Sequence, residues 1–223
     1  MTATKLKTVR VWDLPTRLFH WSLVLLLAFL WYSGGGDEAL MAWHMRAGYL
    51  LLALLLFRIA WGFIGSPWSR FRNFVATPRT AIDYGLRFLR GQQPIHLTHN
   101  PLGGLMVLAM LALLLLQTLT GLFATDDISI HGPLNDHVTS ATARMLTRIH
   151  NWNFDLLLIL AALHLLAVIA HRLRHEPLTL AMITGRKNVP DPNAPDHPYT
   201  PIWKAALVIA GTATLVWTLV TFA

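Results

Sequence analysis

Five long apolar segments constrain this chain more than any other feature of its sequence. Each can cross about 30 Å of hydrocarbon as a helix that rises roughly 1.5 Å per residue. Because 54% of the residues are hydrophobic and only 13% charged, a water-soluble domain could not bury the apolar surface. The sequence therefore predicts an all-α integral membrane protein, a four-helix bundle with a fifth, C-terminal helix. The segments lie near residues 17–34, 42–64, 102–124, 146–172 and 202–222.

Capping residues and prolines at the ends of the segments support these limits. Asp13 can cap the first segment, and Pro15 suits its first turn. A proline-rich linker from Pro190 to Pro201 separates the fifth segment from the other four. We therefore expect a four-helix membrane domain over residues 1–187, followed by a linker and a last helix over 188–223. Residues 78–90 are typical of a short amphipathic helix at the membrane surface.

The charges predict an orientation in the membrane. Lys and Arg gather in the N-terminal tail and in the loops after the second and fourth segments, whereas the 35–41 and 125–145 loops are mainly acidic. Basic loops stay in the cytoplasm, so we expect a cytoplasmic N-terminus and a periplasmic C-terminus in a bacterial inner membrane. The net charge of +7 then faces anionic lipid, and we expect no nucleic-acid partner.

Four histidines fall inside the apolar segments. His164 follows His150 by 14 residues, which returns it to within about 40° of the same helix face and about 21 Å further along. Helix direction puts His20 at the cytoplasmic depth of His164 and His44 at the periplasmic depth of His150. Intramembrane ionisable residues are costly, so this arrangement indicates two cofactor sites more than packing.

Pairs of facing imidazoles are typical of six-coordinate b-type haem, which transfers electrons rather than binding oxygen. We therefore expect two haems, an inner one on His20 and His164 and an outer one on His44 and His150. The absence of cysteine excludes iron–sulfur clusters, covalently attached haem and disulfides. The candidate partners of the haem propionates are Arg17 and Arg58 for the inner haem and Arg148 for the outer one, with snorkelling to the interface as the alternative role.

Other polar residues leave alternatives open. His171 is a candidate contact of the inner haem or of a quinone. His131 and His137, in the outer loop, are candidates to face a redox partner or a quinone. A solvated surface role is otherwise expected for the histidines outside the four ligands: His96, His99, His131, His137, His171, His175 and His197. Asp155 is expected to bond a neighbouring helix, or else to relay protons.

Several motifs resemble the bacterial cytochrome b561 and nickel-iron hydrogenase b-type cytochrome subunit family. They are Arg17-Leu-Phe-His20-Trp21, His44-Met-Arg-Ala-Gly48, Arg58-Ile-Ala-Trp-Gly-Phe-Ile-Gly65, His99-Asn-Pro-Leu-Gly103 and the His150…His164 pair. The resemblance spans about residues 10–187. It implies a four-helix core with two b haems on the same four histidines, and the fifth helix departs from the small four-helix members.

The resemblance implies an electron relay between the quinone pool and a periplasmic partner, either a c-type cytochrome or a hydrogenase-like oxidoreductase. Such a chain is a subunit without substrate chemistry of its own. The alternative is a stand-alone superoxide:quinone oxidoreductase, which would turn over without a protein partner. A haem-free transporter or proton channel would instead use the histidines with an acidic intramembrane partner. The sequence leaves the oligomeric state open.

Overall fold

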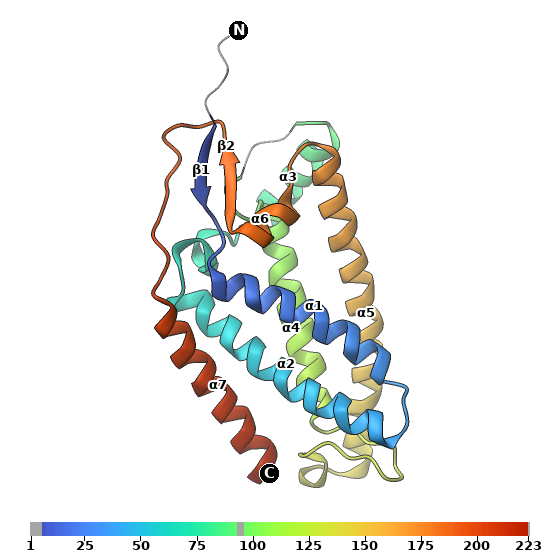
Figure 1. The fold of residues 1–223 in the computed structure, drawn as a ribbon. Helices are drawn as coiled ribbons and strands as arrows, with labels where there is room; N and C mark the ends of the chain where they lie inside the picture. Colours follow the sequence, from blue (N-terminus) through green and yellow to red (C-terminus); the bar gives the residue numbers. More distant parts are fainter. Residues whose placement is uncertain (1–5, 93–95, 223) are drawn as a thin grey trace.

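Five helices are long and apolar enough to cross a membrane, which confirms the predicted all-α membrane fold. The computed structural model describes residues 6–92 and 96–222. Each helix overlaps its predicted segment, and α5 extends the furthest beyond it (Figure 1). The spans are α1 (Leu14–Ser33), α2 (Glu38–Ile64), α4 (Pro101–Gly121), α5 (Ser140–Leu173) and α7 (Ile202–Phe222).

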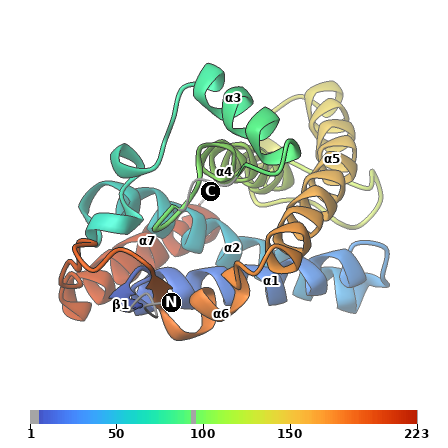
Figure 2. The ribbon, with the colours of Figure 1, turned by 90° about the horizontal axis from the view of Figure 1, so that it is seen from above.

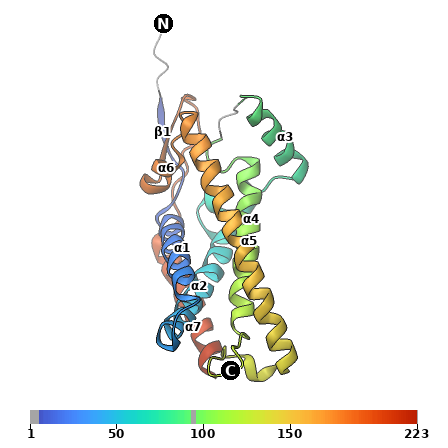
Figure 3. The same cartoon turned by 90° about the vertical axis from the view of Figure 1, so that its right-hand side faces the viewer.

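The spanning helices pack in a row that does not close on itself. Helix α1 packs on α2, α2 on α4, and α4 on α5, whereas α7 lies along α2. Viewed from above, α7 and α5 are on opposite sides of the molecule (Figure 2), and α4 runs beside α5 (Figure 3). Within the described residues, α1 and α5 have no extensive packing against each other. The bundle is therefore open along the α1–α5 side.

Asp13 starts α1 and also joins it to α2. Its carboxylate accepts hydrogen bonds from the Thr16 amide at 2.9 Å, the Trp61 indole at 2.9 Å and the Ser69 hydroxyl at 3.3 Å. Ser69 ends the short helix η1 (Pro67–Ser69), which is followed by η2 (Phe71–Asn73). The prediction that Asp13 is the N-terminal cap of α1 is confirmed, and both oxygens of its buried carboxylate accept hydrogen bonds.

A small cap covers the end of the bundle where α1 begins. Strand β1 (Lys7–Arg10) pairs antiparallel with β2 (Arg186–Val189), which follows the short helix α6 (Leu178–Thr184). The cap has an apolar core of its own, made by Val9, Val11, Trp12, Ala181, Val189 and Ala194. Strand β2 runs across the residue at which we expect the first domain to end, and that division stays a prediction.

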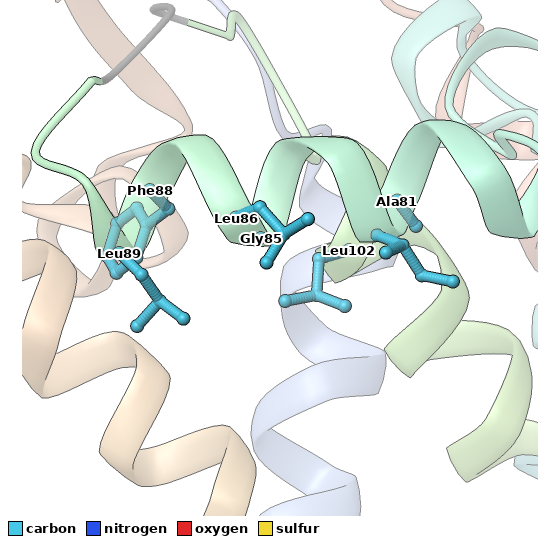
Figure 4. A pocket seen from close by; sticks show the side chains of 7 residues that line it. Ala81, Gly85, Leu86, Phe88, Leu89 and Leu102 are labelled. Atoms are coloured by element: carbon cyan, nitrogen blue, oxygen red, sulfur yellow. The ribbon is translucent and has the colours of Figure 1, made fainter.

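Helix α3 (Pro78–Leu89) is the amphipathic surface helix that the sequence predicts. It lies across the start of α4, and the two helices enclose an apolar groove of about 310 Å³ (Figure 4). Its lining is Ala81, Ile82, Gly85, Leu86, Phe88, Leu89 and Leu102. At the other end of the bundle, the loop after α4 contains the short helix η3 (Asn135–His137).

Candidate functional site

The structure brings His20 of α1 near His164 of α5. The two rings lie close enough to interact electrostatically, and both side chains are half-buried. The Nδ1 atom of His20 is buried without a hydrogen-bond partner in the described structure. A buried polar atom without a partner is unusual in a folded protein and is typical of a site built for another group. The pair lies toward the capped end of the bundle.

Arg58 and His99 join this inner pair. Arg58 is 3% exposed, its Cζ atom lies 5.1 Å from the centre of the Phe71 ring, and its Nη1 has no hydrogen-bond partner within the described residues. The ring of His99 lies 4.7 Å from that of Trp12 and 4.4 Å from that of Phe74.

His99 interacts electrostatically with Arg58, His20 and His164, and its Nδ1 also lacks a hydrogen-bond partner among the residues that the structure describes. Burial, reinforced by the charge of Arg58, lowers the pKa of His99 to about 3. The expectation of a solvated His99 is therefore wrong. Three buried groups with unused hydrogen-bonding capacity meet at this end, where an acidic substituent would find donors.

The outer pair is held differently. His150 Nδ1 donates to the Gln117 carbonyl at 2.9 Å. His44 Nδ1 lies 3.0 Å from the Ser33 hydroxyl, which itself donates to the Phe29 carbonyl at 2.8 Å and therefore accepts from the histidine. His44 and His150 are within electrostatic range of each other. In both rings the proton is on Nδ1, which leaves the lone pair of Nε2 available for a metal.

Glycines leave room beside these rings. A Cβ atom on Gly121 would lie 3.0 Å from His150 Cε1, and one on Gly34 would lie 3.5 Å from His44 Cε1. Gly48 follows His44 by one helical turn, and a Cβ atom there would meet nothing within 4 Å. These glycines allow a flat group to approach the helix backbone closely, which larger side chains would prevent.

The donor set suits haem better than a metal held by protein alone. Within residues 6–92 and 96–222, no three His, Cys, Asp or Glu side chains cluster to hold a metal ion. An iron whose equatorial ligands belong to a porphyrin requires only two axial protein ligands, and each histidine pair can supply them. The residues present therefore fit haem at both ends.

The three arginines predicted to bind haem propionates lie in different surroundings. Arg58 lies beside the inner pair, as described above. Arg17 instead donates from Nη1 to the Ile183 carbonyl at 2.5 Å, which ties α1 to α6. Arg148 is exposed, and its place two residues before His150 puts it about 160° around α5 from that ring. Within the described residues, Arg17 Nε is itself buried without a hydrogen-bond partner, whereas Arg148 is exposed, and the roles of both at a haem stay predictions.

His171 is buried, with 6% of its surface exposed, so the expectation of a solvated side chain is wrong. Its Nδ1 lies 2.7 Å from a Glu176 oxygen, and its Nε2 lies 3.2 Å from the side-chain nitrogen of Asn100, the cap of α4. Lys187 reaches the other oxygen of Glu176 at 2.5 Å. Burial alone would raise the pKa of Glu176, but hydrogen bonds from His171 and Lys187 lower it to about 2.

Two outer residues keep a surface position. His131 is exposed, and its Nδ1 lies 2.9 Å from the Thr125 hydroxyl, while His137 is exposed in η3. Asp155 is also exposed and has no hydrogen bond or ion pair within the described part of the chain. The expected bond from Asp155 to a neighbouring helix is therefore not found among the described residues.

Comparison with known proteins agrees with this site. Residues 11–185 match the family model of prokaryotic cytochrome b561. The probable Ni/Fe-hydrogenase 1 B-type cytochrome subunit of Escherichia coli strain K12 is 28% identical over 116 residues, which cover 41% of this chain and 49% of that relative. The protein of the same description in strain O157:H7 matches equally. The chain thus spans about half the length of these curated relatives, and no solved structure matches it.

The match to the family model includes all four bundle helices and both histidine pairs. Family membership implies haem b, in agreement with the donor set, and the five spanning helices indicate a multi-pass bacterial membrane protein. This chain belongs to the prokaryotic cytochrome b561 family and is a b-type membrane cytochrome.

Proposed function

We propose that this cytochrome holds two b haems and relays electrons across the inner membrane between the quinone pool and a periplasmic redox partner. The observation that supports this best is the presence of two histidine pairs at opposite ends of α5. His20 and His164 would hold the inner haem, and His44 and His150 the outer one. When bound, haem supplies a reversible one-electron couple, and two axial histidines leave no open position for oxygen chemistry.

The protein's own groups would orient and tune each site. Gln117 and Ser33 hold the outer histidines in the tautomer that presents Nε2. Arg58 and His99 offer unused donors at the inner site, where they can bind propionates. The positive charge of Arg58 would also stabilise the more negative, reduced state of that site. Arg17 bonds the Ile183 carbonyl through Nη1 but has a buried Nε without a partner in the described residues, so it stays a propionate candidate. Arg148 is a weaker candidate because its position lies about 160° around α5 from His150.

The outer loop fits a cationic partner. Its exposed acids are Asp126, Asp127 and Asp136, and Asp127 is partly neutralised by Arg144 at 3.4 Å. A basic c-type cytochrome would dock there by charge complementarity. The description of the Escherichia coli relatives favours a hydrogenase-like oxidoreductase as the other class of partner. This docking requires the predicted orientation, with the N-terminus in the cytoplasm and the C-terminus in the periplasm.

The proposal is tested by counting haem in purified protein. We expect two b haems per chain by the pyridine haemochrome method, with one lost in His20→Ala and one in His44→Ala. The exposed His131→Ala variant is the matched control and should keep both. A fully haem-supplied preparation that folds without haem would refute the proposal.

Double variants test the pairing itself. His20→Ala combined with His164→Ala should lose only the inner haem, because both ligands belong to one site. His20→Ala combined with His44→Ala should lose both haems. Loss of both haems in the first double variant would contradict the pairing. Quinone turnover with superoxide, in the absence of a protein partner, would favour the stand-alone oxidoreductase instead.

A further inference from the structure

A carboxylate lies near the middle of the predicted membrane layer. Asn153 of α5 donates to the Leu113 carbonyl of α4 at 2.9 Å, so the two residues lie at one depth. Leu113 precedes the end of α4 at Gly121 by eight residues, which is about 12 Å of helix. Asp155, two residues beyond Asn153, is therefore about 15 Å from the outer end of α4, half of a hydrocarbon core about 30 Å thick.

This carboxylate faces away from its own bundle. Asp155 follows His150 by five residues, so it lies about 140° around α5 from that ring and about 160° from Asn153. Its side chain is exposed and unbonded within the described residues. An acidic group facing hydrocarbon costs roughly 2.5–3.5 kcal/mol, and such groups normally face protein. The position therefore favours a polar partner that the described residues of this chain do not supply.

The surface around Asp155 has the spacing of a helix-packing seam. Nine positions of α5 alternate by three and four residues, and every one of them is exposed. This spacing lets two helices pack along their whole length with a small crossing angle. The seam consists of Met145, Arg148, Trp152, Asp155, Ile159, Ala162, Leu166, Ile169 and Leu173.

We propose that the α5 seam binds the same seam of a second copy of this chain. A two-fold axis along the membrane normal makes the two α5 helices parallel and equal in depth. In such a pair, a residue at the position of Asp155 inserts beside Trp152 of the other copy. Side chains on a helix lean toward its N-terminus, which brings the carboxylate of Asp155 toward that indole.

The seam is complementary to itself. Trp152 is 76% exposed and presents an indole N–H donor one turn from the acceptor Asp155. Two copies therefore form two reciprocal hydrogen bonds and leave neither carboxylate facing lipid. A polar residue within such a seam also selects one register. This dimer goes beyond the electron relay and does not depend on it.

Cysteine cross-linking tests the dimer directly, because the chain has no native cysteine. Ile159→Cys places a thiol in the seam, and Leu215→Cys places one on α7 at nearly equal exposure, 57% against 60%. Mild oxidation in native membranes should link two copies through Ile159→Cys and not through Leu215→Cys. Equal linking at both sites, or linking of Ile159→Cys to a different polypeptide, would overturn the proposal.

Two further variants test the hydrogen bonds. Trp152→Phe keeps a large aromatic ring but removes the indole N–H, and Asp155→Leu removes the acceptor. Each should weaken dimerisation by about tenfold or more, because two interhelical bonds are lost at once. The haem count per chain should stay unchanged, which separates this outcome from failure of the relay. A wild-type protein that is monomeric in mild detergent and in native membranes would refute the dimer.

Discussion

Glu176 should hold the cap onto the bundle, and replacing it with Gln tests this. Its two oxygens accept from His171 at the end of α5 and from Lys187 in β2. Lys187 also donates to the His96 carbonyl at 2.6 Å, which fastens the segment before α4. One carboxylate thus joins three separate parts of the chain. Glu176→Gln keeps the shape but removes the charge that both donors use.

The magnitude follows from the pKa of Glu176. A fall from 4.5 to about 2 on folding corresponds to about 3–4 kcal/mol before screening. Because the side chain is 23% exposed and water screens part of the interaction, we expect roughly 2–3 kcal/mol. The folded pKa lies below the unfolded one, so the charged carboxylate stabilises the folded state. That stabilisation is complete above pH 4.5 and is lost as the pH falls toward 2.

Hydrogen–deuterium exchange of the β1 and β2 amides measures this local stability. At neutral pH, Glu176→Gln should exchange about thirtyfold faster or more than the wild type at the same pH. The ratio should shrink as the pH falls below 4.5, where the wild-type carboxylate begins to lose its contribution. Asp83→Asn, at an exposed acid of α3, is the control and should change nothing. An unchanged rate at neutral pH, or a ratio independent of pH, would show that the Glu176 carboxylate does not hold the cap onto the bundle.

Three other substitutions test single features. Asp13→Ala removes the acceptor for three donors and should cost about 3–5 kcal/mol in detergent unfolding; a loss below about 1 kcal/mol would contradict the network. Gly121→Ala should displace the His150 ring and lower retention of the outer haem, measured by haem count, while the inner haem persists. Arg58→Gln should lower the reduction potential of the inner haem by tens of millivolts in a redox titration, and an unchanged potential would place Arg58 away from it.

Much of the fold could be predicted because it depends on local pattern. Helix length and apolar content identify the five spans, and the residue types of Asp13 and Pro15 identify the start of α1. Depth along a helix is likewise a matter of counting, since each residue adds about 1.5 Å. The same counting gives the depths of His20, His44, His150 and His164, which the structure then brings near one another as two pairs.

Contacts between segments that are far apart in the sequence could not be predicted from local pattern. Arg17 has the right depth for the inner site, but the sequence does not reveal that α6 returns to offer the Ile183 carbonyl. Similarly, His171 resembles a surface histidine at a helix end until Asn100 and Glu176 are placed beside it. The burial of His99, in contrast, could have been predicted from the sequence. His99 directly precedes Asn100, the N-terminal cap of the spanning helix α4, and a side chain at that place lies near the ends of the other helices.

Arg148 and Asp155 show what helix phase adds to helix depth. Depth alone places Arg148 beside the proposed outer haem, but its phase, about 160° from His150, directs it away. Asp155 shares that outward phase, lying about 20° from Arg148 around α5. Because the inward face of α5 is occupied by the histidines and Asn153, polar residues of opposite phase such as Asp155 have no partner within the part of the chain that the structure describes. Helix phase, which follows from the sequence alone, therefore separates the residues of the proposed haem face of α5 from those of the proposed dimer seam.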